Sequence, residues 1–284
     1  MKKFAKLLFR SKTGTLGFLL TILIVVLAIF APQIAPNDPN KINAVHLLKP
    51  PVWEEGGSTR FLLGTDNLGR DLLSRIIHGS RVSLLVGFFS VVVAGVIGSF
   101  LGLMAGFFGG IVDSAIMRLS DAFLSIPRVL LALVVLSVMS PGMLTLIFVI
   151  GVTNWVVYAR LIRSEVLVIR QLDYIKAAYI ARCSNSRIIF RHILPNVFSS
   201  IIVVSTLSVA QSIILEASMS FLGLGIQPPT VSWGGILADG RNYLASNWWI
   251  ATFPGIGITI SVVGIMFLGN WLRDVLDPKN QGIL

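Results

Sequence analysis

The chain has 284 residues, of which 55% are hydrophobic and only 13% are charged. Soluble domains carry about a quarter charged residues, so this composition argues against an ordinary soluble enzyme. The formal charge of +10 would favour nucleic-acid binding in a soluble chain, but in a membrane protein cationic loops set orientation and contact anionic lipid. We therefore expect membrane lipid, and not nucleic acid, to be the partner of these charges.

Acidic and basic residues are absent from long stretches of the sequence. A helix needs about 20 apolar residues to cross a bilayer, and the alternation typical of a membrane β-strand is not found. The sequence therefore predicts an all-α membrane protein with several spans. The charge-free stretches are 13–37, 82–112, 129–159, 193–215, 217–238 and 242–272.

The N-terminal segment 1–13 carries five basic residues and no acidic residue. The apolar run that follows it is longer than the hydrophobic part of an ordinary signal peptide, so we predict an uncleaved first span over 14–32. The proline-rich sequence "APQIAPNDPN" ends this span, because proline cannot continue a helix. Residues 33–81 are then expected to form an external loop.

Within that loop, "TDNLGRDLLSRIIHGSR" (65–81) has the apolar spacing of an amphipathic helix. Thr65 or Asp66 could cap the helix, and Asp71 could pair with Arg75 at a spacing of four residues. We interpret the segment as an interfacial helix that orients the second span. The alternative is a contact with an external binding protein.

The apolar run 129–159 is too long for one straight crossing, and "MSPGM" breaks it in the middle. Two helices fit better, one over 114–139 and one over 143–162. The first of these would contain Arg118 and Asp121, which are three residues apart and could pair on one helix face.

Charge bias supports this division into two helices. The loop 160–192 carries seven basic residues against Glu165 and Asp173, so the positive-inside rule places it in the cytoplasm together with the N-terminus. An even number of spans must separate the two, and the division gives four. The complete prediction is six spans with both ends in the cytoplasm. The other segments are a span at 82–107, a cytoplasmic loop at 163–196, a span at 197–219, an external hairpin at 220–247, a span at 248–270 and a cytoplasmic tail.

The cytoplasmic loop contains "DYIKAAYIARCSNSRIIFRHILPN" (173–196), which has the pattern of two short amphipathic helices joined at "CSNS". Pro195 lies where the second helix must bend toward the next span. An ordered elbow at this position indicates a docking element for a cytosolic partner, and the alternative is a helical hairpin on lipid headgroups. The apolar stripes are Tyr174, Ile175, Ala178 and Ala181 in the first helix, and Ile188, Ile189, Ile193 and Leu194 in the second, with Arg187 and Arg191 opposite.

This segment resembles the EAA coupling loop of ABC-importer permeases. Lys176 stands where that pattern has Glu, and Arg182 where it has Gly. Arg182 could adopt a positive φ at a cost of about 1 kcal/mol, or the turn could shift to Asn185. The matching residues are Ala177, Ala178, Ile189, His192, Leu194, Pro195 and Asn196.

Further motifs extend the resemblance to the second permease subunit of the dipeptide/oligopeptide transport family. They are "LGTDNLGRDLLSRIIHGSRVSL", "GLMAGFFGGIVDSAIMRLSD", "SFLGLGIQPPTVSWGGIL" and "LRDVLDPK". The resemblance implies a type I ABC-importer permease fold with a core permease domain at 82–284, in a bacterial cytoplasmic membrane. Its partners would be a homologous permease subunit, two cytosolic ATPases that carry ATP and Mg²⁺, and an extracytoplasmic peptide-binding protein.

The same resemblance implies that this chain is a transport subunit without catalytic residues, metal or bound cofactor. Its substrates would be di- or oligopeptides, and nickel, glutathione or another small solute remains open. The residues implied in ATPase coupling are Tyr174, Lys176, Ala177, Ala178, Arg182, Cys183, Ser184, Arg187, Arg191, His192, Pro195 and Asn196.

Glu216 is the acidic residue deepest within an apolar stretch. An ionisable residue inside a membrane faces the bundle interior or a wet cavity. Glu216 could bind a peptide's amino group on the translocation path, with Ser212 and Ser220 beside it. The alternative is a structural residue held by hydrogen bonds. In the hairpin that follows, Asp239 and Arg241 are expected to be solvated, and the tryptophans to lie near the headgroups. These are Trp233, Trp248 and Trp249.

Two other functional classes are weaker. A secondary transporter would have carboxylates that bind the coupling ion at the midplane, and repeat symmetry. Glu216 is the one residue that supports this class. A membrane enzyme predicts clustered catalytic residues within the spans, and none are found. The sequence has neither a His-Glu-x-x-His motif nor a Gly-Lys dipeptide, so metal and phosphate-loop chemistry are not expected. Cys183 is expected to be an incidental exposed residue.

Overall fold

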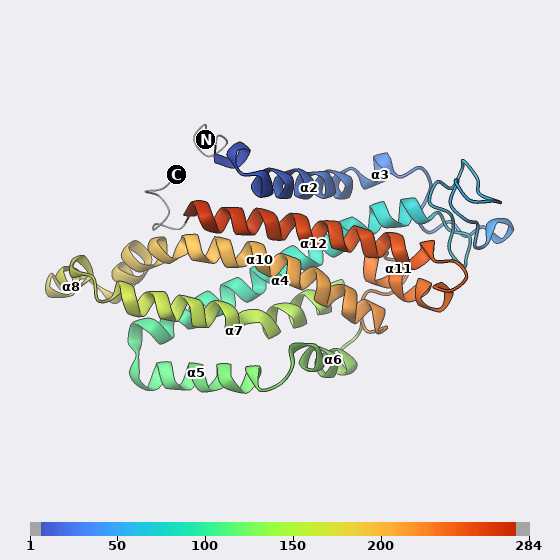
Figure 1. Cartoon of the computed structure of the whole chain (residues 1–284). Helices are drawn as coiled ribbons and strands as arrows, with labels where there is room; N and C mark the ends of the chain where they lie inside the picture. The colour runs from blue at the N-terminus through green and yellow to red at the C-terminus, as the bar shows by residue number, and fades with distance from the viewer. Residues whose placement is uncertain (1–6, 277–284) are drawn as a thin grey trace.

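A computed structural model describes residues 7–276, and the regular elements in this part of the chain are helices (Figure 1). In chain order they are α2 (Lys12–Ile29), α3 (Ala31–Ile34), η1 (Ala44–His46), α4 (Leu72–Phe108), α5 (Gly110–Leu124), α6 (Arg128–Val138), α7 (Met143–Ile169), α8 (Asp173–Ile180), α9 (Asn185–Arg187), η2 (Ile188–Ile193), α10 (Leu194–Phe221), α11 (Trp233–Gly240), η3 (Arg241–Tyr243) and α12 (Trp249–Leu276).

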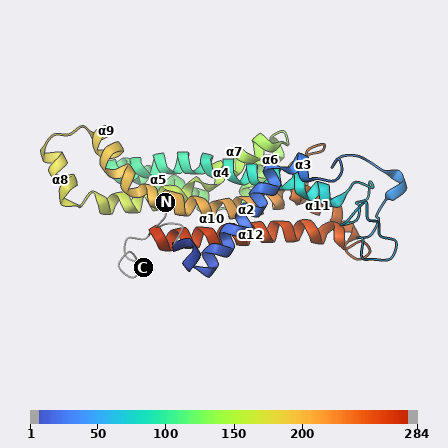
Figure 2. The same cartoon turned by 90° about the horizontal axis from the view of Figure 1, so that it is seen from above.

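Five helices are long and apolar enough to cross a membrane: α2, α4, α7, α12 and the continuous helix Asn185–Phe221 that contains α10. They run along a common direction in both views (Figures 1 and 2). The pair α5 and α6 would make a sixth span, although the two are bent by 87°. This architecture confirms the predicted all-α membrane class, and the number of six spans stays a prediction.

The centre of the bundle is the contact between α4 and α7, where small residues recur at every fourth position of α4. A Cβ added to Gly98 would lie 2.3 Å from the Trp155 carbonyl oxygen, and one added to Gly102 would lie 2.6 Å from that of Ala159. The two backbones therefore approach more closely than larger side chains allow, as is common between membrane helices. The small residues are Ser90, Ala94, Gly98, Gly102 and Gly106, all of them buried.

The expected separate amphipathic helix over 65–81 is not formed. Asp66 accepts hydrogen bonds from the backbone N–H groups of Leu68 and Arg70, each at 2.9 Å, and such a turn competes with helix formation. The helix begins at Leu72, with the Asp71 carboxylate accepting from the Ser74 N–H at 3.2 Å. From there α4 continues through the expected second span without a break.

The expected single helix over 114–139 is two helices, α5 and α6. Proline at 127 has no N–H group and disfavours helical backbone in the preceding residue, so the chain turns between Leu124 and Arg128. Asp121 pairs with Arg160 of α7 and not with Arg118 as expected. A second ion pair, between Asp113 and Arg163, also ties α5 to α7.

The segment 220–247 contains α11 and packs against α10 and α12. Trp233 and Trp249 are buried. The Trp233 indole N–H donates to the Ile76 carbonyl at 2.9 Å, and the Trp249 indole N–H donates to the Thr65 carbonyl at 3.1 Å. Trp248 is partly exposed, and its indole N–H donates to the Glu54 carboxylate at 3.0 Å. Two of the three tryptophans therefore pack inside the chain, and a position of these residues near the headgroups stays a prediction.

Candidate functional site

The segment 173–196 forms the predicted elbow, with α8 as its first arm and α9 leading into α10 as its second. Figures 1 and 2 both show α8 projecting beyond the ends of α7 and α10. The first arm ends at Ile180, and the second begins at Asn185 with Ser184 as its cap. The Ser184 hydroxyl accepts a hydrogen bond from the Arg187 N–H at 3.4 Å, as the turn sequence indicated.

The turn between the arms is built on Arg182, whose φ is +52°. The Arg182 N–H donates to the Tyr179 carbonyl at 3.0 Å, and the Cys183 N–H donates to the Ala178 carbonyl at 3.1 Å. These two bonds form a Schellman motif, which requires left-handed backbone at the residue where the family pattern has glycine. Of the two alternatives in the sequence, Arg182 adopts the positive φ, while Asn185 lies in α9.

Isoleucine side chains fix the elbow to the end of the bundle. They pack against the ends of α4 and α7, around Phe107 and Val166. Ile188 and Ile193 are five residues apart, and η2 between them is a π-helix, which brings residues of this spacing onto one face. Pro195 follows at the start of α10 and has no N–H for a regular helical bond. The fully buried residues are Ile175, Ile188 and Ile193 of the elbow and Val197, which follows it in α10.

Polar and aromatic contacts also join the two arms of the elbow to each other. The Asn196 side-chain amide donates to the Tyr174 hydroxyl at 3.2 Å, and the rings of Tyr174 and His192 lie 6.4 Å apart. Lys176, at the position of the family Glu, pairs with Asp173 at 3.3 Å on the exposed side of α8. Both arms are therefore held in one arrangement by contacts within this chain.

The outer surface of the elbow is basic and partly apolar. Ala178, Cys183 and His192 are partly buried, so Cys183 is less exposed than the sequence predicts. Ile180 and Phe190, which are not among the expected coupling residues, are 83% and 67% exposed. Both are large apolar residues outside the two apolar stripes of the sequence. The remaining expected coupling residues are exposed: Tyr174, Lys176, Ala177, Arg182, Ser184, Arg187, Arg191, Pro195 and Asn196.

Glu216 lies fully buried between α10 and α4. Its carboxylate accepts hydrogen bonds from the Ser83 hydroxyl at 2.9 Å and from the Ser220 hydroxyl at 2.8 Å. Ser212 is also buried, but its hydroxyl has no hydrogen-bond partner within residues 7–276. The structure therefore joins Glu216 with Ser220 and with Ser83. The sequence does not indicate Ser83, because it lies 133 positions away on another helix.

A family model described as the binding-protein-dependent transport system inner membrane component matches residues 98–282. The chain belongs to this family. A second model, the N-terminal TM domain of oligopeptide transport permease C, matches residues 1–51. The expected resemblance to dipeptide and oligopeptide permeases is thereby confirmed, and the chain is a transport component of the membrane.

Curated relatives match nearly the whole chain. The di/tripeptide transport system permease protein DppC of Pseudomonas aeruginosa is 44% identical, over 98% of this chain and 92% of the relative. The dipeptide transport system permease protein DppC of Haemophilus influenzae is 40% identical, over 95% and 92%. The glutathione transport system permease protein GsiD of Pectobacterium atrosepticum is 38% identical, over 98% and 91%.

Among solved structures, a chain of the MetNI methionine ABC transporter in an inward-facing conformation has the same fold. The TM-score is 0.56 at 19% identity, and the match covers 71% of this chain and 96% of that chain. A second crystal form of the same transporter matches with a TM-score of 0.57 at 18% identity. At this identity the likeness concerns the fold alone.

Proposed function

We propose that this chain is a permease subunit of an ATP-driven importer of di- and oligopeptides. The observation that carries the proposal is the elbow 173–196, an ordered projection that is fixed to the bundle by buried isoleucines while its outer face stays exposed. A helical pair that only rested on lipid would not need this anchoring to α4 and α7. The names of the relatives support short peptides as the substrate class.

The proposal includes six spans with both ends in the cytoplasm. The start of α2, the end of α12 and the elbow lie at one end of the bundle, while α11 and the start of α4 lie at the other (Figure 1). The basic residues of the N-terminal segment and of the loop 160–192 favour the cytoplasm for the first end. In this topology α5 and α6 together make the third crossing of a bacterial cytoplasmic membrane.

The proposed partners are a homologous permease subunit, two cytosolic ATPases and an extracytoplasmic peptide-binding protein. ATP and Mg²⁺ bind to the ATPases, and this chain binds no cofactor. When the ATPases close, they move the elbow, and the buried isoleucines transmit this motion to α4, α7 and α10 as a rigid body. Access to the path between the two permease subunits then alternates between the two sides of the membrane.

Glutathione is a second candidate substrate, because a relative that covers nearly the whole chain is named for glutathione transport. Both candidates are short peptides, so the same path could serve either. In this proposal the binding protein selects between them. The experiment below therefore includes both substrates with the matching binding protein.

The test is uptake of radiolabelled dipeptide or glutathione into proteoliposomes that contain this chain and its partner subunits. We expect uptake to require ATP, the binding protein and this chain together. The proposal fails if the full complex imports no peptide. It also fails if the purified chain alone transports on an ion gradient, which would make it a secondary transporter.

A further inference from the structure

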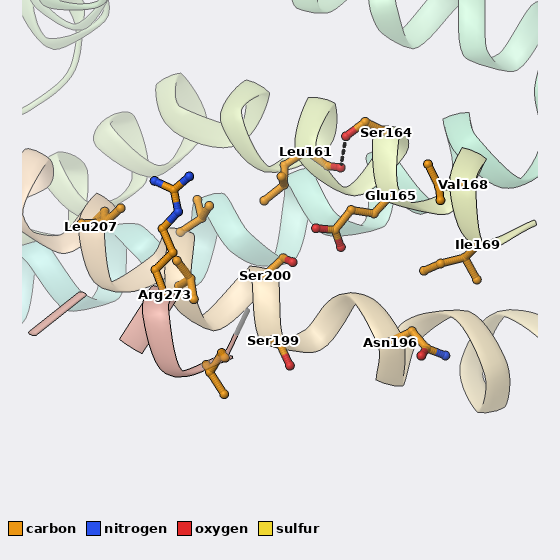
Figure 3. Close-up of a pocket in the computed structure, with 13 residues that line it drawn as sticks. Leu161, Ser164, Glu165, Val168, Ile169, Asn196, Ser199, Ser200, Leu207 and Arg273 are labelled. Atoms are coloured by element: carbon orange, nitrogen blue, oxygen red, sulfur yellow. Dashed lines mark hydrogen bonds between the residues drawn. The ribbon is translucent and has the colours of Figure 1, made fainter. Parts of the chain in front are cut away.

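A pocket of about 720 Å³ opens between α7, α10 and α12, at the same end of the bundle as the elbow (Figure 3). Its volume lies within the range of about 300–1,000 Å³ that is usual for small-molecule sites. Part of its wall is apolar, with Val203 and Leu207 of α10 among the residues that form it. Its polar lining consists of Ser164, Glu165, Asn196, Ser199, Ser200 and Arg273.

The pocket receives one acidic and one basic side chain from different helices, Glu165 from α7 and Arg273 from α12. Figure 3 shows the Glu165 carboxylate directed toward Ser200 of α10. Within residues 7–276, neither Glu165 nor Arg273 has an opposite charge within 4.0 Å. Among the described residues, neither charge is therefore neutralised by an ion pair.

This combination selects a particular kind of ligand. A simple anion would be repelled by Glu165, and a simple cation by Arg273. A short peptide carries an ammonium group at one end and a carboxylate at the other, with apolar atoms between, so it can satisfy both charges and the apolar wall together. Carboxylate–guanidinium and carboxylate–ammonium contacts are among the stronger hydrogen bonds in proteins.

We propose that this pocket is a release subsite for zwitterionic short peptides, in which Glu165 binds the α-ammonium group and Arg273 binds the carboxylate. The inference rests on the proposed function and on its topology, which places the pocket at the cytoplasmic end of the path. Glu165 is partly exposed and Arg273 is exposed, so water screens both charges and keeps binding weak. Weak binding suits a subsite from which the peptide must leave.

The experiment measures peptide binding to the complete complex in nanodiscs, without ATP and without the binding protein, by calorimetry. The probes are dialanine, N-acetyl-dialanine and dialanine amide. We expect the wild-type complex to bind dialanine more tightly than either blocked form. Glu165→Gln should raise the dissociation constant for dialanine about threefold, as expected for an ion pair that water screens.

The variants should also separate the two ends of the peptide. Glu165→Gln should abolish discrimination against N-acetyl-dialanine and keep discrimination against the amide. Arg273→Gln should do the reverse. Glu165→Asp and Arg273→Lys keep the charges and should retain both preferences. Ser137→Ala, at an exposed serine of α6 outside the pocket, should change neither.

Equal binding of the three peptides by the wild-type complex would overturn the proposal, and this comparison needs no variant to fold. Unchanged dissociation constants in Glu165→Gln and Arg273→Gln would overturn it as well. If ATP-dependent uptake persists in either case, the release subsite is wrong while the importer function stands. Absence of uptake by the wild-type complex would instead remove the proposed function.

Discussion

Arg182 carries a backbone conformation that most side chains avoid. Its φ of +52° brings its Cβ close to its own carbonyl oxygen, which costs about 1–2 kcal/mol. The two hydrogen bonds of the turn and the buried isoleucines on either side hold it in place. The elbow therefore stores a small strain at the position where the coupling-loop pattern that it resembles has glycine.

We predict that Arg182→Gly stabilises the elbow by about 1 kcal/mol, because glycine adopts positive φ without this strain. Amide hydrogen exchange of residues 173–196, measured by mass spectrometry, should become slower. Asn185→Gly is the matched control, since Asn185 is helical and glycine in a helix costs about 0.5–1 kcal/mol. Faster exchange in Arg182→Gly would contradict the strain.

Glu216 acts, in the arrangement seen here, as a buried junction between α4 and α10. Its carboxylate accepts from Ser83 on one helix and from Ser220 on its own. Both hydroxyls would lose their acceptor if the side chain became apolar. These hydrogen bonds favour a structural role for Glu216 over direct binding of a peptide's amino group.

We predict that Glu216→Gln keeps peptide uptake, because the amide retains one oxygen acceptor and the same shape. Glu216→Leu should lower the stability of the purified complex by about 1–3 kcal/mol, the cost of leaving buried hydroxyls unpaired. Thermal unfolding and uptake are measured for both. Loss of uptake in Glu216→Gln, with folding and ATP hydrolysis intact, would instead indicate that Glu216 contacts the substrate.

At the scale of elements, the contact of α4 with α7 depends on the small residues of α4. We predict that Gly102→Ala destabilises the chain by about 1–3 kcal/mol, as overpacking does, because the new Cβ would lie 2.6 Å from the Ala159 oxygen. Gly255→Ala in α12 is the control, since its Cβ would meet nothing within 4 Å. The thermal midpoint should fall for the first variant and hold or rise for the second.

The sequence predicts where long helices lie better than where they bend. Charge-free stretches and their length suffice to predict membrane helices, and these are found. The 87° bend between α5 and α6 was missed because the prediction carried a helix through Pro127. The start of α4 was misplaced because Asp66 closes a local turn, and a helical pattern in the sequence cannot show that competition.

The elbow was predictable because its two apolar stripes and the turn between them are local patterns. The sequence does not show which residue of the turn has positive φ, because propensity alone cannot decide between Arg182 and Asn185. Contacts between distant helices, such as that of Ser83 with Glu216, could not be read from one sequence. The same holds for the ion pairs of Asp239 with Arg70 and Arg75, because the sequence alone predicts a solvated charge at Asp239.

At the scale of the molecule, an ion network holds together the end opposite the elbow, with Asp66, Arg70 and Arg75 buried and Asp239 partly exposed. The Asp66 carboxylate lies 2.6 Å from Arg70 and 3.4 Å from Arg75, and Asp239 of α11 lies 3.0 and 3.1 Å from the same two residues. The network joins the segment before α4, the first turn of α4 and α11. Ion pairs therefore link residues that are far apart in the chain at this end of the bundle.

We predict that Asp66→Asn is strongly destabilising, by about 3–5 kcal/mol, because it removes a buried carboxylate from two buried guanidinium groups. The thermal midpoint of the purified chain should fall sharply, and proteolysis of residues 35–71 should become faster. Asp173→Asn breaks an exposed ion pair and should change neither measurement. Equal behaviour of the two variants would show that the network does not hold this end together.

The elbow at the other end should connect the bundle to the ATPases through Ile180 and Phe190, which are exposed apolar residues beside a basic surface. We predict that the double variant Ile180→Asp, Phe190→Asp folds normally, because neither side chain supports the core, but no longer retains the ATPases. Their co-purification with the permease and the ratio of uptake to ATP hydrolysis are measured. Val45→Asp, equally exposed at 82% but in the segment before α4, should keep the ATPases bound. Retention of the ATPases by the double variant would place the coupling contact elsewhere on the elbow.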